Sequence, residues 1–389
     1  MTCNKTSFYF FNKIVVLSII IIFFSCKKSK IENEKVITPK LKISNYIKQD
    51  SVSTLVFEKL EEFLLIKNQD FRSSKYWSDL DFEHYIFPYN DIVNIEMSKE
   101  GESIYEPKVL ELLHIEGTNE YIVKIAFLKY SNQELGIKCI YNLIFDIKEQ
   151  KFKRILNYNT RNWKKIDVGD IEYYISPLRE FNITEALEFD YANKKIAQLF
   201  EMESKSVKYY SCISPVELFE IKGFDYIHNM YMSDKGGLSE VTSNILFSGN
   251  DSDTYNHEIV HFYTYEKYYS TIGNLSLINE GLATFIGGSG EASYSVLRKK
   301  LMLFLEKESI DVNGYLYPYS NDEMRNEIAY TIGAILCERS LRLYGRSSFL
   351  DIFYAKNLQE VMIYLNINEA NLVMELKNEL KNEPIELLW

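Results

Sequence analysis

The spacing of apolar residues along residues 51–158 changes from a helical period to an alternating one. Within 51–67, Leu55, Leu60, Phe63 and Leu64 recur at near-helical spacing, which predicts an amphipathic helix. Four apolar runs follow, rich in β-branched and aromatic residues and separated by polar turns, at 109–115, 121–130, 137–147 and 152–158. Such runs predict an antiparallel meander. We therefore expect residues 51–164 to form an α+β accessory domain.

Helical spacing dominates residues 165–389. We expect short strands at 170–176, 207–213 and 244–248, with helices at 184–203 and 215–221 between them. Further helices are expected at 254–269, 275–286, 293–307, 327–344, 347–355, 358–365 and 369–380. The predicted fold class is α+β, in which an N-terminal helix and antiparallel sheet precede a second domain with a small sheet and a mainly helical C-terminal half.

The first 25 residues are typical of an export signal. Lys5 and Lys13 precede an apolar run at 14–24 that is too short to span a bilayer comfortably. Ser25-Cys26 after this run resembles a bacterial lipoprotein box, although Phe23 stands where Leu is usual. The resemblance implies a lipid on Cys26, a tether at 26–50 and a protein anchored to the cell envelope at the outer membrane, facing the periplasm or the cell surface. The alternative is an ordinary signal peptide or a short membrane anchor with a free Cys26.

The net charge of −11 argues against a nucleic-acid partner, because no basic stripe accompanies it. Cys139, Cys212 and Cys337 lie beyond Cys26, and none has the CxxC spacing of a structural zinc site. Each stands in an apolar stretch, so we expect buried thiols. The sequence leaves their disulfide state and the oligomeric state open.

Candidate chemistry is concentrated at 254–267, where His257-Glu258-Ile259-Val260-His261 stands in a predicted helix. Residues four apart lie on one face of a helix, so both imidazoles can point at one metal ion. Glu258 is placed to act as a general base on a metal-bound water. Glu280 supplies a third candidate ligand, with eighteen residues between it and His261. The alternative is an exposed helix with two solvated histidines, but histidine is scarce, at five in 389 residues.

The pattern HExxH, eighteen residues, then Glu within Asn279-Glu280-Gly281-Leu282-Ala283 resembles the gluzincin zinc peptidases, with the spacing of their aminopeptidase-N-like members. The resemblance covers about residue 165 to the C-terminus. It implies one zinc ion on His257, His261 and Glu280, with Glu258 as the general base. Tyr330, in a stretch similar to the YxxG of these enzymes, would stabilise the oxyanion; the alternative is a buried helical aromatic, because the chain has 30 tyrosines. The helix-then-sheet pattern of 51–164 is similar to the NTF2-like fold.

These features predict a zinc metallopeptidase that acts on a peptide or protein substrate. The exopeptidases of that group hold the substrate's amino terminus with a GxMEN segment, and none occurs between residues 171 and 257, so an endopeptidase is favoured. In gluzincins the strand before the metal helix commonly binds substrate, which implicates 244–248 or a neighbouring strand; the alternative is a plain core strand. Two alternatives stay open: an inactive metal-containing binding lipoprotein, and a zinc hydrolase of a non-peptide amide.

Three local details are also expected around the motif. Ser252 or Asp253 would cap the metal helix. Gly281 and Ala283 are small, which would let the second helix approach the metal helix closely enough for Glu280 to reach the metal. Thr284, one turn after Glu280, would hydrogen-bond a ligand.

Overall fold

The computed structural model describes residues 41–387, apart from 70–71, 99–100, 132–133, 291, 308–310 and 320–321. The predicted signal peptide, the lipid-accepting Cys26 and most of the predicted tether lie outside the described residues. None of the helices in the described part is both long and apolar enough to cross a membrane. The lipid anchor therefore stays a prediction.

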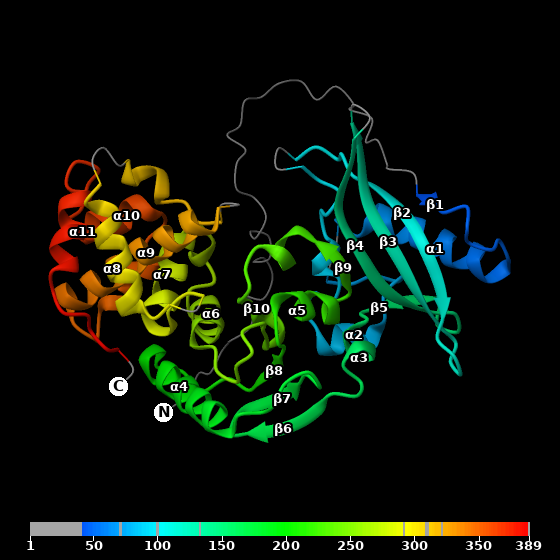
Figure 1. The fold of residues 1–389 in the computed structure, drawn as a ribbon, viewed down its shortest axis with the longest axis horizontal. Helices are drawn as coiled ribbons and strands as arrows, with labels where there is room; N and C mark the ends of the chain where they lie inside the picture. Colours follow the sequence, from blue (N-terminus) through cyan, green and yellow to red (C-terminus); the bar gives the residue numbers. More distant parts are fainter. Residues whose placement is uncertain are drawn as a thin grey trace, which may run out of the picture. The chain divides into compact units, whose positions relative to one another are not determined.

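The alternating runs of the first part of the chain form a six-stranded sheet (Figure 1). Its order is β1-β2-β3-β4-β5, and β9 pairs with β4 off this path. Strands β2 to β5 are antiparallel neighbours in chain order, which confirms the meander, and β1 runs parallel to β2. The strands are β1 (Lys42–Ile43), β2 (Glu106–His114), β3 (Glu120–Ser131), β4 (Glu134–Asp146), β5 (Lys151–Lys153) and β9 (Phe224–Ile227).

Helix α1 (Ser51–Ile66) confirms the predicted amphipathic helix and packs on this sheet. Its buried Leu60 and Phe63 share one apolar cluster with Phe145 of β4. The Asp50 side chain accepts a hydrogen bond from the Ser53 N–H at 2.9 Å, which satisfies a free donor of the first turn. The helix is therefore fixed both by its cap and by the apolar face it buries.

The predicted strand at 152–158 is wrong in its second half. Strand β5 ends at Lys153, and Leu156–Asn159 form helix α3. The backbone N–H of Arg154 donates to Asp81 Oδ2, in helix α2 (Asp79–His84), at 2.7 Å. A backbone donor that is bonded to a side chain cannot extend the hydrogen-bond ladder of a sheet, so the chain leaves the sheet at this point.

A second sheet has five strands in the order β10-β11-β8-β7-β6. Strands β7 and β11 run parallel to β8, whereas β6 and β10 pair antiparallel with β7 and β11. The elements of this part are β6 (Lys164–Val168), β7 (Ile171–Ile175), α4 (Ile183–Phe200), β8 (Val207–Ser211), α5 (Pro215–Lys222), β10 (Gly237–Glu240) and β11 (Ile245–Ser248). Because β11 has a neighbour on each side, β10 is the strand at that edge.

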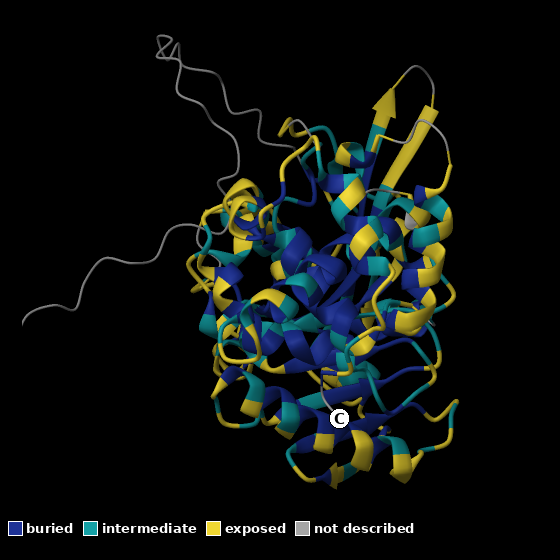
Figure 2. Ribbon diagram, turned by 90° about the vertical axis from the view of Figure 1, so that its left-hand side faces the viewer, coloured by how far each residue is buried: buried dark blue, intermediate teal, exposed yellow. Residues whose placement is uncertain are grey.

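The C-terminal part is mainly helical, as predicted. Its helices are α6 (Asn256–Lys267), α7 (Ser276–Gly287), α8 (Tyr294–Leu305), α9 (Glu323–Tyr344), α10 (Leu358–Tyr364) and α11 (Leu372–Leu380). The predicted helix at 347–355 is a 3₁₀ helix, Phe349–Tyr354. Buried side chains from β7 to α11 form one apolar cluster, and Figure 2 shows buried positions in the interior of these helices.

Helices α7 and α9 touch through their backbones at Gly281 and Gly333. A Cβ at Gly281 would lie 2.2 Å from the carbonyl carbon of Gly333, and a Cβ at Gly333 would lie 2.1 Å from the Leu277 carbonyl oxygen. The expectation that Gly281 brings α7 close to α6 is therefore wrong, because Gly281 faces α9. The close approach to α6 is made by Gly287, where a Cβ would lie 2.2 Å from the backbone nitrogen of His257.

A cluster of four charged groups connects the loops of the first sheet with the edge strand β10. Arg154 donates to the two carboxylate oxygens of Glu240 at 2.8 and 2.9 Å, and Lys222 pairs with Glu240 as well. Asp91 lies 3.1 Å from the Lys222 ammonium. Burial alone would raise the pKa of Glu240, but the charges of Arg154 and Lys222 outweigh it and lower the pKa. Two positive and two negative groups thus balance at the end of β10.

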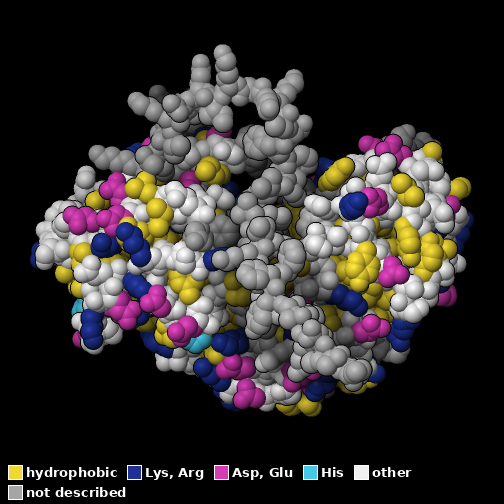
Figure 3. Space-filling view, turned by 180° about the vertical axis from the view of Figure 1, so that it is seen from behind, with side chains coloured by type: hydrophobic (Ala, Val, Ile, Leu, Met, Phe, Trp, Pro, Cys, Tyr) yellow, Lys and Arg dark blue, Asp and Glu magenta, His cyan; other side chains and the backbone are white. Residues whose placement is uncertain are grey.

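The fold class is α+β, with two mixed sheets in the N-terminal and middle parts and a mainly helical C-terminal part. Strand β9 comes from the predicted second domain but pairs with β4. The boundary near residue 164 and the NTF2-like resemblance stay predictions. On the face drawn in Figure 3, acidic and basic side chains are intermingled over the described surface.

The Gly281–Gly333 contact generates a testable prediction. Gly333→Ala would force a methyl group into the Leu277 carbonyl, so α7 must move away from α9. Overpacking of this kind costs about 1–3 kcal/mol, and we expect that loss in the free energy of unfolding measured in urea.

Gly273→Ala is the matched control, because a Cβ there meets nothing within 4 Å. If both variants unfold at the same urea concentration as the original chain, the contact between Gly281 and Gly333 does not constrain the two helices.

Candidate metal centre

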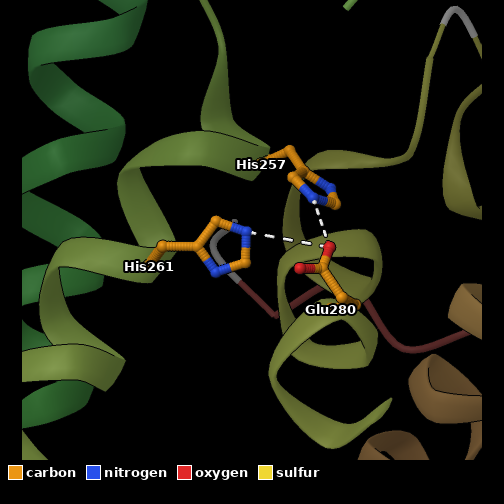
Figure 4. A group of neighbouring side chains, drawn as sticks. All are labelled: His257, His261 and Glu280. Carbon is orange, nitrogen blue, oxygen red and sulfur yellow. Dashed lines mark hydrogen bonds and ion pairs between the residues drawn. The ribbon is translucent and has the colours of Figure 1, made fainter. Parts of the chain in front are cut away.

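Two helices bring together the three candidate ligands. His257 and His261 project from one face of α6, and Glu280 projects from α7 toward both rings (Figure 4). Glu280 Oε2 lies 3.2 Å from His257 Nε2 and 3.8 Å from His261 Nε2. One ligand atom from each residue lies within 4.8 Å of the others, and all three residues are buried. The alternative, an exposed helix with two solvated histidines, is therefore wrong.

The backbone at the end of α7 fixes the orientation of the His257 ring. Its Nδ1 lies 2.7 Å from the carbonyl oxygen of Gly288. A carbonyl only accepts, so Nδ1 carries the hydrogen and donates it. In the neutral ring, the form that binds a metal, the lone pair is then on Nε2, which faces Glu280; in the metal-free protein, Nε2 of the protonated ring donates to Glu280 Oε2. A histidine whose second nitrogen donates to a backbone carbonyl is the usual arrangement of a metal ligand.

Glu280 and the imidazoles beside it shift each other's pKa. Burial alone would raise the pKa of Glu280, but the charges of His261 and His257, together with hydrogen bonds from His257 and Tyr319, lower it to about 2. Burial alone would lower the pKa of His257, but the hydrogen bond and charge of Glu280 raise it. The carboxylate is therefore ionised, which is the form of a carboxylate that binds a metal.

The donor set fits a metal ion. Two imidazole nitrogens and one carboxylate oxygen are ligands that zinc accepts, and three protein ligands leave a position for water or substrate. Imidazole and carboxylate suit several other divalent metals as well. The structure thus supports a possible metal site made by His257, His261 and Glu280.

The two other residues singled out in the sequence lie beside this triad. Glu258 is buried and follows His257 on α6. The ring of Tyr330, on α9, lies 6.3 Å from the ring of His257. Burial, followed by the charges of Glu280 and Glu258, raises the pKa of Tyr330, so its hydroxyl is protonated at neutral pH. Within the described residues, that hydroxyl makes no hydrogen bond.

Sequence reasoning missed Tyr319. Its hydroxyl donates to Glu280 Oε1 at 2.8 Å, on the carboxylate oxygen that does not face the histidines. Tyr319 stands in a loop before α9, with a positive φ of 70°. With 30 tyrosines in the chain and no regular spacing around this one, no local signal marks it. Only the folded chain brings residues 280 and 319 together.

Two expected details of the site are wrong. The N-cap of α6 is Tyr255, which makes no side-chain cap bond. Asp253 cannot serve as the cap because it accepts from Arg179, Ser211 and the backbone N–H of Asn182. Thr284 does not bond a ligand, since its buried hydroxyl has no partner among the described residues.

Among the described residues, the other histidines and the cysteines take no part in the candidate metal site. His84 and His114 are exposed and bond the carbonyl oxygens of Leu80 and Thr118. Cys139, Cys212 and Cys337 are free and buried, which confirms the expected buried thiols.

A pocket of about 390 Å³ opens beside the triad, at the first turn of α6. Its described lining comes from the loop before β10, the loop after β11, residues 254–256 and the end of α7. Gly287, one of its lining residues, packs on the backbone nitrogen of His257. The residue that precedes the candidate ligand His257 in the sequence, Asn256, also lines this pocket.

Comparison with known proteins does not assign the chain to a protein class. No protein-family model matches the chain, and no curated protein matches it. What the chain is must therefore be inferred from its fold and from the triad.

The hydrogen bond from Tyr319 to Glu280 leads to a testable prediction about metal affinity. Tyr319→Phe removes the donor that holds Glu280, and loss of such a partner typically weakens metal binding about 10- to 100-fold. We expect that loss in competition of the protein with a zinc chelator. Tyr317→Phe, in the same loop and 73% exposed, is the matched control. Equal zinc affinity of Tyr319→Phe and the original chain, with unchanged thermal unfolding, would contradict the positioning role.

Proposed function

We propose that this protein is a zinc-dependent endopeptidase of the gluzincin type. The observation that carries the proposal is the buried triad of His257, His261 and Glu280, with Glu258 directly beside it. A site that only holds a metal does not need a fourth ionisable group at this position. The HExxH spacing and the NEGLA sequence around Glu280 support the same class.

Zinc on these three ligands would polarise a peptide carbonyl and lower the pKa of a bound water to about 7. The residues of the chain supply the remaining steps. Glu258 accepts the proton of the attacking water and later delivers it to the leaving amine, which is general base and general acid catalysis by one carboxylate. Tyr330 donates from its free, protonated hydroxyl to the carbonyl oxygen as this becomes negative. Tyr319 and the Gly288 carbonyl orient Glu280 and His257.

The substrate is an extended peptide that adds to the edge of strand β10. The sequence implicates residues 244–248 or a neighbouring strand in substrate binding. Strand β11, which contains these residues, is paired on both sides, with β10 and with β8, so the edge strand β10 is the better candidate. Strand β10 contacts α6, and a Cβ at Gly237 would touch the ring of Tyr255 next to the metal helix. A peptide paired with β10 would therefore run past the triad, held by backbone hydrogen bonds.

In this proposal, the protein acts outside the cytoplasm and is attached to the cell envelope through a lipid on Cys26. The apolar run at 14–24 and the Ser25-Cys26 pair support this placement. Its substrates are peptides or proteins, and no nucleic acid is involved. The alternatives, a binding lipoprotein without turnover and a hydrolase of a non-peptide amide, are outcomes of the experiment below.

The experiment compares the purified full-length protein with Glu258→Gln, measuring zinc content and hydrolysis of casein and quenched fluorescent peptides. We expect one equivalent of zinc in both, and a loss of at least about 100-fold in kcat in the variant, because general acid–base catalysis contributes about 10²–10⁴-fold. Glu266→Gln, on the same helix but exposed, is the matched control and should keep full activity.

Zinc in all three proteins without cleavage of any peptide would overturn the peptidase and favour the binding protein or a non-peptide amide substrate. Absence of zinc from all three would overturn the metal centre itself.

A further inference from the structure

The pocket beside the triad has a chemistry that the proposed mechanism does not use. Among its described lining residues, Lys235 is the one charged side chain, and the others are polar residues, Tyr255 and two glycines. No carboxylate among the described residues forms an ion pair with Lys235. In a chain of net charge −11, a lone cation in a concave site beside the candidate active site calls for an anionic partner.

The lysine is held in place by the loop that faces it. Its ammonium donates to the backbone carbonyl of Asn250 at 2.8 Å, and the neighbouring Gly236 N–H donates to Asn250 Oδ1 at 2.7 Å. The Gly249 N–H donates to the carbonyl of Gly236 at 2.7 Å. One of three ammonium hydrogens is thus used, and two remain for a ligand. Because the backbone fixes this loop, little ordering is required when a ligand binds.

A second observation in the pocket independently points to a peptide ligand. The side-chain oxygen of Asn256 is buried and has no hydrogen-bond partner among the described residues. Asn256 lines the pocket and precedes the candidate ligand His257. A buried acceptor without a partner is unfavourable, so rotation of the Asn256 side chain into the pocket, where a peptide N–H can donate to it, would be favoured when a peptide binds.

We propose that this pocket is a specificity subsite that binds a carboxylate of the peptide substrate on Lys235, while Asn256 accepts a backbone N–H of the same peptide. This inference rests on the proposed peptidase function. The carboxylate has two possible sources, an Asp or Glu side chain or the free carboxyl terminus of the peptide. The volume of about 390 Å³ accommodates either, and the chemistry that the two sources share is a carboxylate.

Equilibrium binding separates this inference from turnover. The zinc-loaded full-length Glu258→Gln protein is titrated with fluorescent, capped alanine hexapeptides that carry Glu or Gln at each position in turn. A second pair has a free or an amidated carboxyl terminus. We expect one Glu peptide, or the free-acid peptide, to bind about tenfold more tightly than its neutral partner, which is the usual contribution of a charge-assisted hydrogen bond. Which pair shows the difference identifies the source of the carboxylate.

The role of Lys235 is tested by adding Lys235→Met to that protein. The preference should disappear in Lys235→Met, return in Lys235→Arg and persist in Lys299→Met, an exposed control. Equal binding of all peptide pairs would overturn the subsite, as would a preference that survives Lys235→Met, because the carboxylate would then bind the metal directly. A Lys235-dependent preference in a protein whose parent cleaves no peptide would support the subsite and overturn the peptidase.

Discussion

The burial of Glu280 between two imidazoles is the constraint on which the rest of this structure depends. A buried carboxylate is costly unless charges and donors compensate it. Here His257 and His261 approach one oxygen, and Tyr319 donates to the other. These contacts require α7 to lie close to α6, and Gly287 makes that approach possible by contacting the backbone of His257. The close packing of α7 on α6 is thus also what the chemistry of the site requires.

The other helices and the second sheet follow from this requirement. Gly281 and Gly333 fix α7 against α9, which in turn carries Tyr330 to the side of His257. In the second sheet, Arg154 and Lys222 bind Glu240 at the end of the edge strand β10. Breaking a buried ion pair by removing one partner typically costs about 3–5 kcal/mol, so this cluster holds β10 firmly. The elements around the candidate active site are therefore fixed by backbone contacts and by ion pairs that belong to the fold.

Local patterns predicted much of the fold and the centre of the site. The spacing of His257 and His261 needs only one helix to place both rings on one face, and the helical and alternating periods located α1, β2 to β4 and α6 to α9. Glu280 was found through its distance from His261 and a family resemblance. Features that depend on contacts between distant segments were missed: Tyr319 on Glu280, β9 on β4, and the use of Asp253 by Arg179, which leaves α6 without its expected cap.

Zinc K-edge X-ray absorption on the zinc-loaded full-length protein tests the metal centre most directly. The account predicts a first shell of nitrogen and oxygen at about 2.0–2.1 Å, with imidazole scattering from two rings that falls to one ring in His261→Ala. A sulfur shell at about 2.3 Å would show that zinc is bound by cysteine instead. A spectrum that His261→Ala leaves unchanged would contradict the triad of His257, His261 and Glu280.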